Sequence, residues 1–143
     1  KKFTVSYDHV PFATFTDPQI AQVGLNETTA QRENINYELS TYNINDLDRA
    51  IIDSDDFGKV KVLTKPNSDK IIGVTIISVN ASEIIAEFVL AMKNNIGLNK
   101  ILSTNHIYPS FAESNKYVAG VWRKNNQPKK AIKLLNWYFK RKL

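Results

Sequence analysis

Two β-rich segments joined by a tight polar turn constrain the fold of this chain more than any other part of its sequence. Residues 58–65 (GKVKVLTK) alternate between polar and apolar side chains, as a half-buried strand does, and residues 70–78 (KIIGVTIIS) are rich in β-branched residues. The residues between them, Pro66 to Asp69, have typical turn chemistry. Two strands linked by so short a turn pair with each other, so the sequence predicts an antiparallel hairpin.

The segments before the hairpin predict mostly β structure with one short helix. Alternation of apolar and polar residues marks the strands, and proline disfavours helix at the residue before it. The predicted elements are a strand over 10–16, a turn at Asp17-Pro18, a helix from a cap at Asn26 or Thr28 to Asn34, a strand over 37–44 and an acidic connector over 45–56.

The segments after the hairpin predict helices. Asn80 or Ser82 can cap a helix that ends near Asn94, and its apolar residues recur at helical spacing. This apolar face is wide, which predicts that the helix lies across a sheet. Shorter helices are expected over 98–103 and from residue 112 to about 121. The fold class that follows is α+β, a two-layer sandwich of an antiparallel sheet with helices on one face.

The composition indicates one globular domain with a tail. A chain of 143 residues with 43% hydrophobic and 23% charged residues can bury a real core, and no stretch approaches the ~20 apolar residues of a membrane span. We predict a domain over residues 1–121 and a basic amphipathic helical tail over 122–143. Because the sequence has no cysteine and no apolar N-terminal segment of signal-peptide length, we expect a cytoplasmic location.

The positive net charge of +5 comes from the tail alone. Residues 122–143 contain eight basic residues and no acidic ones, which leaves a net charge of about −3 on the rest of the chain. A basic face on the folded body is therefore not expected, and we predict no nucleic-acid partner. The tail can pack on its own domain, or its lysines and aromatic residues can contact an anionic membrane surface peripherally.

One polar segment has the composition of half a redox active site. Residues 104–113 (TNHIYPSFAE), called the site loop below, contain an imidazole, a phenol and a carboxylate in His106, Tyr108 and Glu113. Elsewhere the sequence has no cysteine, no glycine-rich phosphate loop and no cluster of metal ligands. The chain is therefore predicted to be part of an enzyme rather than a whole one. Each of the three residues could also have a purely structural role, as a turn histidine, a packed tyrosine and a helix-start glutamate.

Four segments, taken in order, resemble one protein family. Residues 10–25 (VPFATFTDPQIAQVGL) are similar to the "P-x-x-x-F-T-x-P-x-[IV]-A-x-V-G" opening of the C-terminal dimerisation domain of flavin-dependent pyridine nucleotide-disulfide oxidoreductases. Residues 70–74 resemble the "I-L-G-x-x" strand of that domain and residues 81–85 its "A-x-E-[IL]-I" helix start. Residues 106–113 correspond to its "H-x-H-P-T-x-x-E" motif. Each motif alone is weakly specific, but the ordered set is strongly so.

The resemblance implies a homodimeric parent enzyme such as dihydrolipoamide dehydrogenase, glutathione reductase or mercuric reductase. In those enzymes the FAD and NAD(P) domains and the redox-active cysteine pair lie upstream of this module. By itself the chain is then expected to hold no cofactor and to be inactive, while the parent uses FAD and NAD(P)H. The helix from Ser82 to Lys93 and the loop from Asn105 to Glu113 are the expected dimer surface, which should be large and apolar.

The resemblance also implies roles for the site loop, which in the family reaches the flavin and dithiol site of the other subunit. His106, Tyr108 and Glu113 are the implied catalytic residues, and His106, Ile107, Tyr108 and Pro109 would contact the partner's flavin.

The family's base, the second histidine of the motif, is replaced by Tyr108. A phenol with an ordinary pKa of about 10 is a poor base at neutral pH, although it can donate a hydrogen bond or a proton. A tyrosine in this loop resembles mercuric reductases, so reduction of a metal ion gains weight as the implied activity, and glutathione-type or lipoamide-type disulfide reduction loses weight. The alternative function is a non-catalytic interaction module whose basic tail docks on a membrane or a nucleic acid.

Overall fold

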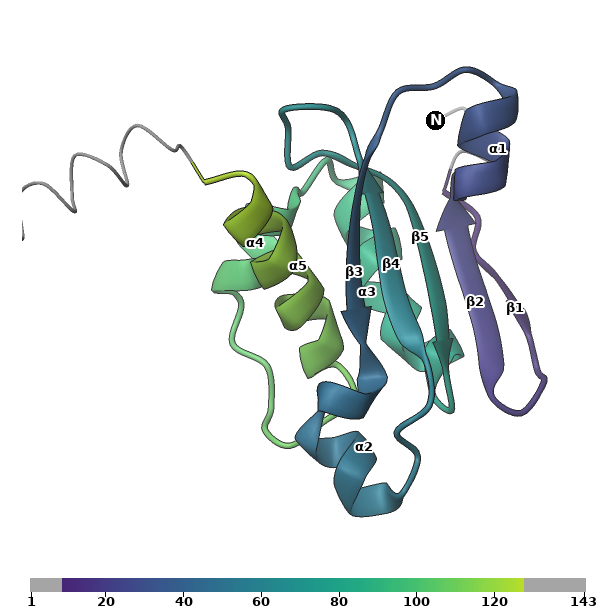
Figure 1. Ribbon diagram of the computed structural model, residues 1–143, viewed down its shortest axis with the longest axis vertical. Coiled ribbons are helices and arrows are strands. Elements are labelled where there is room, and N and C mark those ends of the chain that lie inside the picture. The colour runs from purple at the N-terminus through teal and green to yellow at the C-terminus, as the bar shows by residue number, and fades with distance from the viewer. Residues whose placement is uncertain (1–8, 128–143) are drawn as a thin grey trace, which may run out of the picture.

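A computed structural model describes residues 9–127 of the chain. Figure 1 shows these residues as a sheet with helices packed against it. The elements in chain order are β1 (Phe12–Thr14), β2 (Gln19–Gly24), α1 (Glu27–Arg32), β3 (Glu38–Asn43), a short 3₁₀ helix (Ile44–Asp46), α2 (Asp48–Asp53), β4 (Lys59–Thr64), β5 (Ile71–Ser78), α3 (Ala81–Lys93), α4 (Leu98–Ser103) and α5 (Glu113–Asn125).

The described strands form one antiparallel sheet in the order β1-β2-β5-β4-β3. The predicted hairpin is confirmed as β4 and β5, in which Val62 pairs with Val74 and Val60 with Ile76. These four side chains are fully buried and share one face of the sheet. The predicted α+β class, with an antiparallel sheet covered by helices, is therefore correct.

Helices α3 and α5 divide the buried face between them. Helix α3 packs on β2 and β5, α5 packs on β3 and β4, and α4 lies against α5 (Figure 1). The side chains of Phe88 on α3 and Val118 on α5 are both fully buried in the same core. The start of the short helix α1 lies at the opposite face of the sheet, where Glu27 pairs with Lys61. The buried face thus explains the wide apolar surface of α3.

Two elements differ from the sequence prediction. Strand β2, which pairs with β5 inside the sheet, was not predicted, because Ile20 points to the open face and breaks the alternation expected of a half-buried strand. The acidic connector over 45–56 contains helix α2, which Leu47 precedes without a side-chain cap. Its buried Ala50 docks it on the domain, so tertiary packing decides this helix.

The predicted end of the domain falls inside a helix. Helix α5 runs to Asn125, and its Trp122 is buried in the core. Packing of this indole therefore carries the helix past residue 121, where the sequence suggested a boundary. The amphipathic helix predicted for the rest of the tail lies outside the described residues.

Alanine substitutions at two glycines should change the free energy of unfolding in opposite directions. A Cβ on Gly73 of β5 would overlap the backbone of Leu25, whereas a Cβ on Gly120 of α5 would lie 3.8 Å from Leu102 Cδ1, an ordinary contact. We expect Gly73→Ala to lower the free energy of unfolding by about 1–3 kcal/mol through overpacking. Gly120→Ala should raise it by up to about 1 kcal/mol, because alanine favours the helix. Urea unfolding of both variants measures these changes, and a Gly73→Ala variant as stable as wild type would contradict the packing.

Candidate functional site

The site loop crosses from α4 to the start of α5 and is held by its side chains. No backbone-to-backbone hydrogen bond involves residues 105–109 in the part of the chain that the structure describes. The loop is instead attached at His106, which meets helix α3, and at Tyr108, which meets helix α2. The Tyr108-Pro109 peptide bond is cis. The loop geometry therefore depends on a few polar contacts with neighbouring helices.

His106 points into the domain. Its Nε2 lies 3.0 Å from Oε2 and 3.2 Å from Oε1 of Glu87, and its Nδ1 lies 3.1 Å from the backbone oxygen of Thr104. Only 6% of the His106 side chain is exposed. Both ring nitrogens are therefore engaged by groups of this chain.

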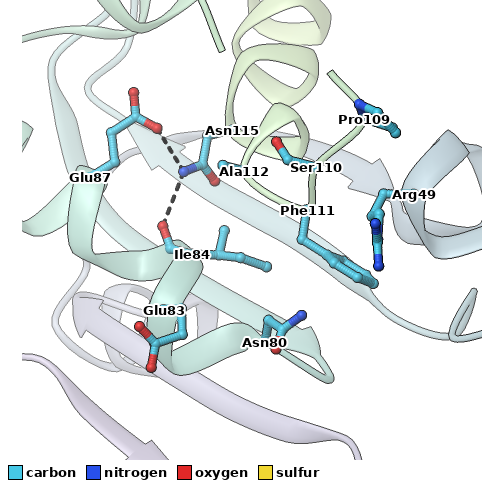
Figure 2. Close-up of a pocket in the computed structure, with 10 residues that line it drawn as sticks. All are labelled: Arg49, Asn80, Glu83, Ile84, Glu87, Pro109, Ser110, Phe111, Ala112 and Asn115. Carbon is cyan, nitrogen blue, oxygen red and sulfur yellow. Dashed lines mark hydrogen bonds between the residues drawn. The ribbon is translucent and has the colours of Figure 1, made fainter. Parts of the chain in front are cut away.

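Asn115 of α5 holds Glu87 from the other side. Its Nδ2 donates to Oε2 of Glu87 over 2.8 Å and to the backbone oxygen of Ile84 over 3.0 Å, as the dashed lines in Figure 2 show. The Asn115 side chain is fully buried between α3 and α5. An amide with two such partners fixes the rotamer of the Glu87 carboxylate.

Tyr108 points outward and is 66% exposed. Its hydroxyl donates to Oδ2 of Asp48, the first residue of α2, over 2.9 Å. This hydrogen bond, together with the negative charge of Asp48, raises the pKa of the Tyr108 phenol above its usual value. The phenol is therefore an even poorer base than its ordinary pKa implies, and it remains a hydrogen-bond donor.

Glu113 is buried at the start of α5. Its Oε2 accepts a hydrogen bond from the backbone N–H of Ser110 over 3.2 Å, and its Oε1 accepts one from the Tyr117 hydroxyl over 3.3 Å. Burial and the nearby Glu113 carboxylate raise the pKa of Tyr117. The ring of Tyr117 also lies 5.2 Å from that of Tyr42, whose pKa burial raises to about 12.

The predicted site residues thus lie on one loop but have separate partners. His106 binds Glu87, Tyr108 binds Asp48, and Glu113 binds the loop backbone and Tyr117, without a hydrogen bond among the three. Ile107 is 82% exposed and Pro109 partly exposed.

Sequence reasoning missed three of the polar partners, namely Asp48, Glu87 and Asn115. Of these three, Glu87 had the clearest sequence signal of a polar partner, because it is a carboxylate beside the apolar residues Ile84 and Phe88 of a core helix. Asp48 lies sixty positions from Tyr108, and no local pattern relates the two.

A cleft of about 410 Å³ opens beside the loop (Figure 2). Helix α3, the start of α5 and Arg49 of α2 surround it. Its lining residues are Arg49, Asn80, Glu83, Ile84, Glu87, Pro109, Ser110, Phe111, Ala112 and Asn115. The wall therefore combines apolar side chains with one cationic group and two carboxylates.

Over residues 9–127, no three or more His, Cys, Asp or Glu side chains are grouped closely enough to hold a metal ion. None of the helices in this range is long and apolar enough to cross a membrane.

Comparison with protein families decides the classification. The family model described as pyridine nucleotide-disulphide oxidoreductase, dimerisation domain, matches residues 10–119. The chain belongs to this family. The match spans every described strand and four of the five described α-helices completely, together with the whole site loop. The alternative of a non-catalytic docking module has no support among the matches.

Curated proteins similar to this chain include dihydrolipoyl dehydrogenases. The chain is 40% identical over 105 residues to the enzyme of Buchnera aphidicola subsp. Acyrthosiphon pisum, covering 73% of the chain and 22% of the enzyme. It is 35% identical over 115 residues to the dihydrolipoamide dehydrogenase of Chaetomium thermophilum, covering 80% of the chain and 23% of the enzyme. The chain thus spans about a quarter of the length of these relatives.

Solved structures show the same fold. LpdA from Mycobacterium tuberculosis matches with a TM-score of 0.75 and 25% identity, over 81% of this chain and 25% of its own. The flavoprotein disulfide reductase RclA from Escherichia coli matches with a TM-score of 0.74 and 20% identity, over 80% of this chain and 26% of its own. The second match is informative for the fold alone.

The Tyr108–Asp48 contact predicts a measurable titration. Ionising the phenol beside a carboxylate is unfavourable, so the pKa of Tyr108 should lie above 10 and fall toward its usual value in Asp48→Asn. Asp53→Asn is the matched control, because Asp53 lies on the same helix but pairs with Arg49. Titration of the labelled phenol carbon by NMR measures the shift. Equal titration of Tyr108 in wild type and Asp48→Asn would refute the contact.

Proposed function

We propose that this dimerisation domain pairs with a second copy inside a longer FAD- and NAD(P)H-dependent disulfide oxidoreductase. Its site loop would then complete the flavin and dithiol site of the partner subunit. The observation that carries the proposal is the outward presentation of Ile107 and Tyr108 on a loop anchored to α3 and α2, in a domain of this family. The upstream FAD and NAD(P) domains are proposed partners within the same enzyme.

The outward face of α3 is the proposed centre of the dimer interface. The core side of this helix is used inside the domain, so the surface left for a partner carries Glu83, Ala86, Glu87 and Leu90. Leu90 is 62% exposed although it is apolar. The site loop adjoins this face through the His106–Glu87 contact, and it adds Ile107. Pairing of two such surfaces about a two-fold axis would bury apolar side chains that are open in the single chain.

The residues present fit contact with a flavin ring held by another subunit, but they do not fit binding of a whole FAD molecule. The sequence lacks a glycine-rich loop for the cofactor phosphates. The predicted flavin contacts Ile107, Tyr108 and Pro109 are accessible on the loop. His106, also predicted to touch the flavin, faces α3, so its role in the proposal is to hold the loop. When bound in the parent enzyme, FAD would supply the electron transfer.

Tyr108 would act in this site as a donor. Its raised pKa keeps the hydroxyl protonated, and donation of this one proton to a reacting thiolate or other anion would replace the hydrogen bond to Asp48 Oδ2. Glu113 would fix the loop through the Ser110 backbone. The names of the relatives support a dithiol of the dihydrolipoyl type as substrate, whereas tyrosine at the base position supports a metal ion as electron acceptor. The cytoplasmic location stays a prediction.

Self-association is the first test of this function. We expect the 143-residue chain to sediment as a dimer, and Leu90→Lys or Ile107→Lys to weaken it. Loss of one buried aliphatic side chain costs about 1.5–3 kcal/mol, and the substitution removes one from each of the two copies, so the dimer dissociation constant should rise roughly 10²- to 10⁴-fold. Leu39→Lys, on the opposite face of the sheet at the edge strand β3, is the control and should leave the dimer intact. A wild-type chain that stays monomeric at high concentration would refute the pairing.

Activity of the parent flavoprotein is the second test. Tyr108→Phe removes only the hydroxyl and should lower kcat by about 10-fold or more if the proton or hydrogen bond is used in the reaction. Tyr37→Phe is the control, since Tyr37 contacts Gln31 away from the loop. Tyr108→His supplies a base that titrates near neutral pH, so it should favour disulfide over metal-ion reduction. Full activity of Tyr108→Phe toward both kinds of acceptor would remove the phenol from the mechanism.

A further inference from the structure

Both ring nitrogens of His106 face hydrogen-bond acceptors, and this constrains how many protons the ring carries. The backbone oxygen of Thr104 can only accept, and an ionised Glu87 carboxylate can only accept. A neutral imidazole has a single N–H and could satisfy one of them. The two contacts are both satisfied when the ring carries two N–H groups, or when Glu87 itself carries a proton.

The surroundings of Glu87 favour the ionised carboxylate. Asn115 Nδ2 donates to Oε2, the same oxygen that lies 3.0 Å from His106 Nε2. Two donors on one oxygen stabilise negative charge there. Of the other charged groups near the loop, Arg49 of α2 and Glu83 of α3 line the cleft beside Glu87, Asp48 of α2 is bonded to Tyr108, and Glu113 of α5 is bonded to Ser110 and Tyr117.

We propose that Glu87 is the positioning residue of the site loop, and that it clamps His106 as a double hydrogen-bond donor between α3 and the Thr104 carbonyl. Asn115 completes the clamp by fixing Glu87. The chain Asn115–Glu87–His106 links α5 and α3 to a loop whose residues 105–109 make no backbone-to-backbone hydrogen bond within the described chain. Ile107 and Tyr108 follow His106 directly, so the clamp sets where they are presented.

In the clamp, His106 has a different role from that of a catalytic histidine. A general base needs a free lone pair directed at the substrate, and both nitrogens of this ring point at groups of its own chain. His106 therefore acts through the loop that it holds. The use of the loop in catalysis rests on the proposed function, whereas the clamp is a property of this chain alone.

Nitrogen-15 NMR of the full 143-residue chain tests the protonation of the clamp. The sequence has only two histidines, His9 and His106, so His9 is an internal reference. At neutral pH we expect both ring nitrogens of His106 to show the shifts of protonated nitrogens. A His106 ring with one protonated and one free nitrogen in the wild type would overturn the double-donor state.

Three variants test the positioning. Glu87→Ala should reduce the backbone order parameters of Ile107 and Tyr108 from about 0.85, typical of rigid backbone, to below about 0.6. Glu87→Gln keeps an acceptor for His106 Nε2 without the charge, so it should retain the loop order while His106 loses its doubly protonated signature. Glu83→Gln, one turn earlier on α3, is the control and should change neither measurement.

The outcomes separate the clamp from the proposed function. Unchanged order at Ile107 and Tyr108 in Glu87→Ala, or an unchanged His106 signature in Glu87→Gln, would overturn the clamp. Should Glu87→Ala fail to fold, Glu87→Gln alone decides through the His106 signature. Sedimentation of the same samples reports dimerisation independently, so a monomeric wild type with an intact clamp would refute only the pairing.

Discussion

Burial of helix α3 against strands β2 and β5 is the interaction on which the rest of this structure depends. Phe88 is fully buried in the core, with Ile84 and Ile85 beside it, and this fixes both the position and the rotation of the helix. Rotation matters because Glu87 and Leu90 then emerge on the other side. One of these residues holds the site loop, and the other is an apolar group left open for a partner. The packing of one helix thus sets both the loop geometry and the proposed dimer face.

The site loop illustrates how side chains can replace backbone hydrogen bonding. Three acidic groups from three helices receive its donors: Glu87 from His106, Asp48 from Tyr108, and Glu113 from the Ser110 backbone. The residues that make these contacts differ in exposure: the His106 side chain is turned inward and Tyr108 is turned outward. The carboxylates of Asp48 and Glu113 discourage ionisation of the Tyr108 and Tyr117 phenols, so the loop presents Tyr108 as a hydrogen-bond donor rather than as a base.

Much of the fold could be predicted because its signals are local. The β4–β5 hairpin needs only two β-rich runs and a polar turn, and helix α3 only apolar residues at helical spacing. Strand β2 was not predicted because its Ile20, on the open face of the sheet, is apolar. Helix α2 was not predicted because burial of Ala50, rather than a capping side chain, stabilises it. The site loop was recognisable from its motif, but its partners were not, since Asp48 and Glu87 come from helices distant in sequence.

The sequence by itself determined the family and the antiparallel sheet with its helical layer. It also determined that a tyrosine occupies the position where the family's motif has a histidine base. These properties follow from residue identity and short-range spacing, which the chain carries whether or not it is folded. Only the tertiary structure decided which way each residue of the loop faces and which carboxylate it meets. The physical reason is that a hydrogen bond requires its two atoms to lie within about 3 Å in a suitable direction, and here packing of α2, α3 and α5 around the loop creates that proximity.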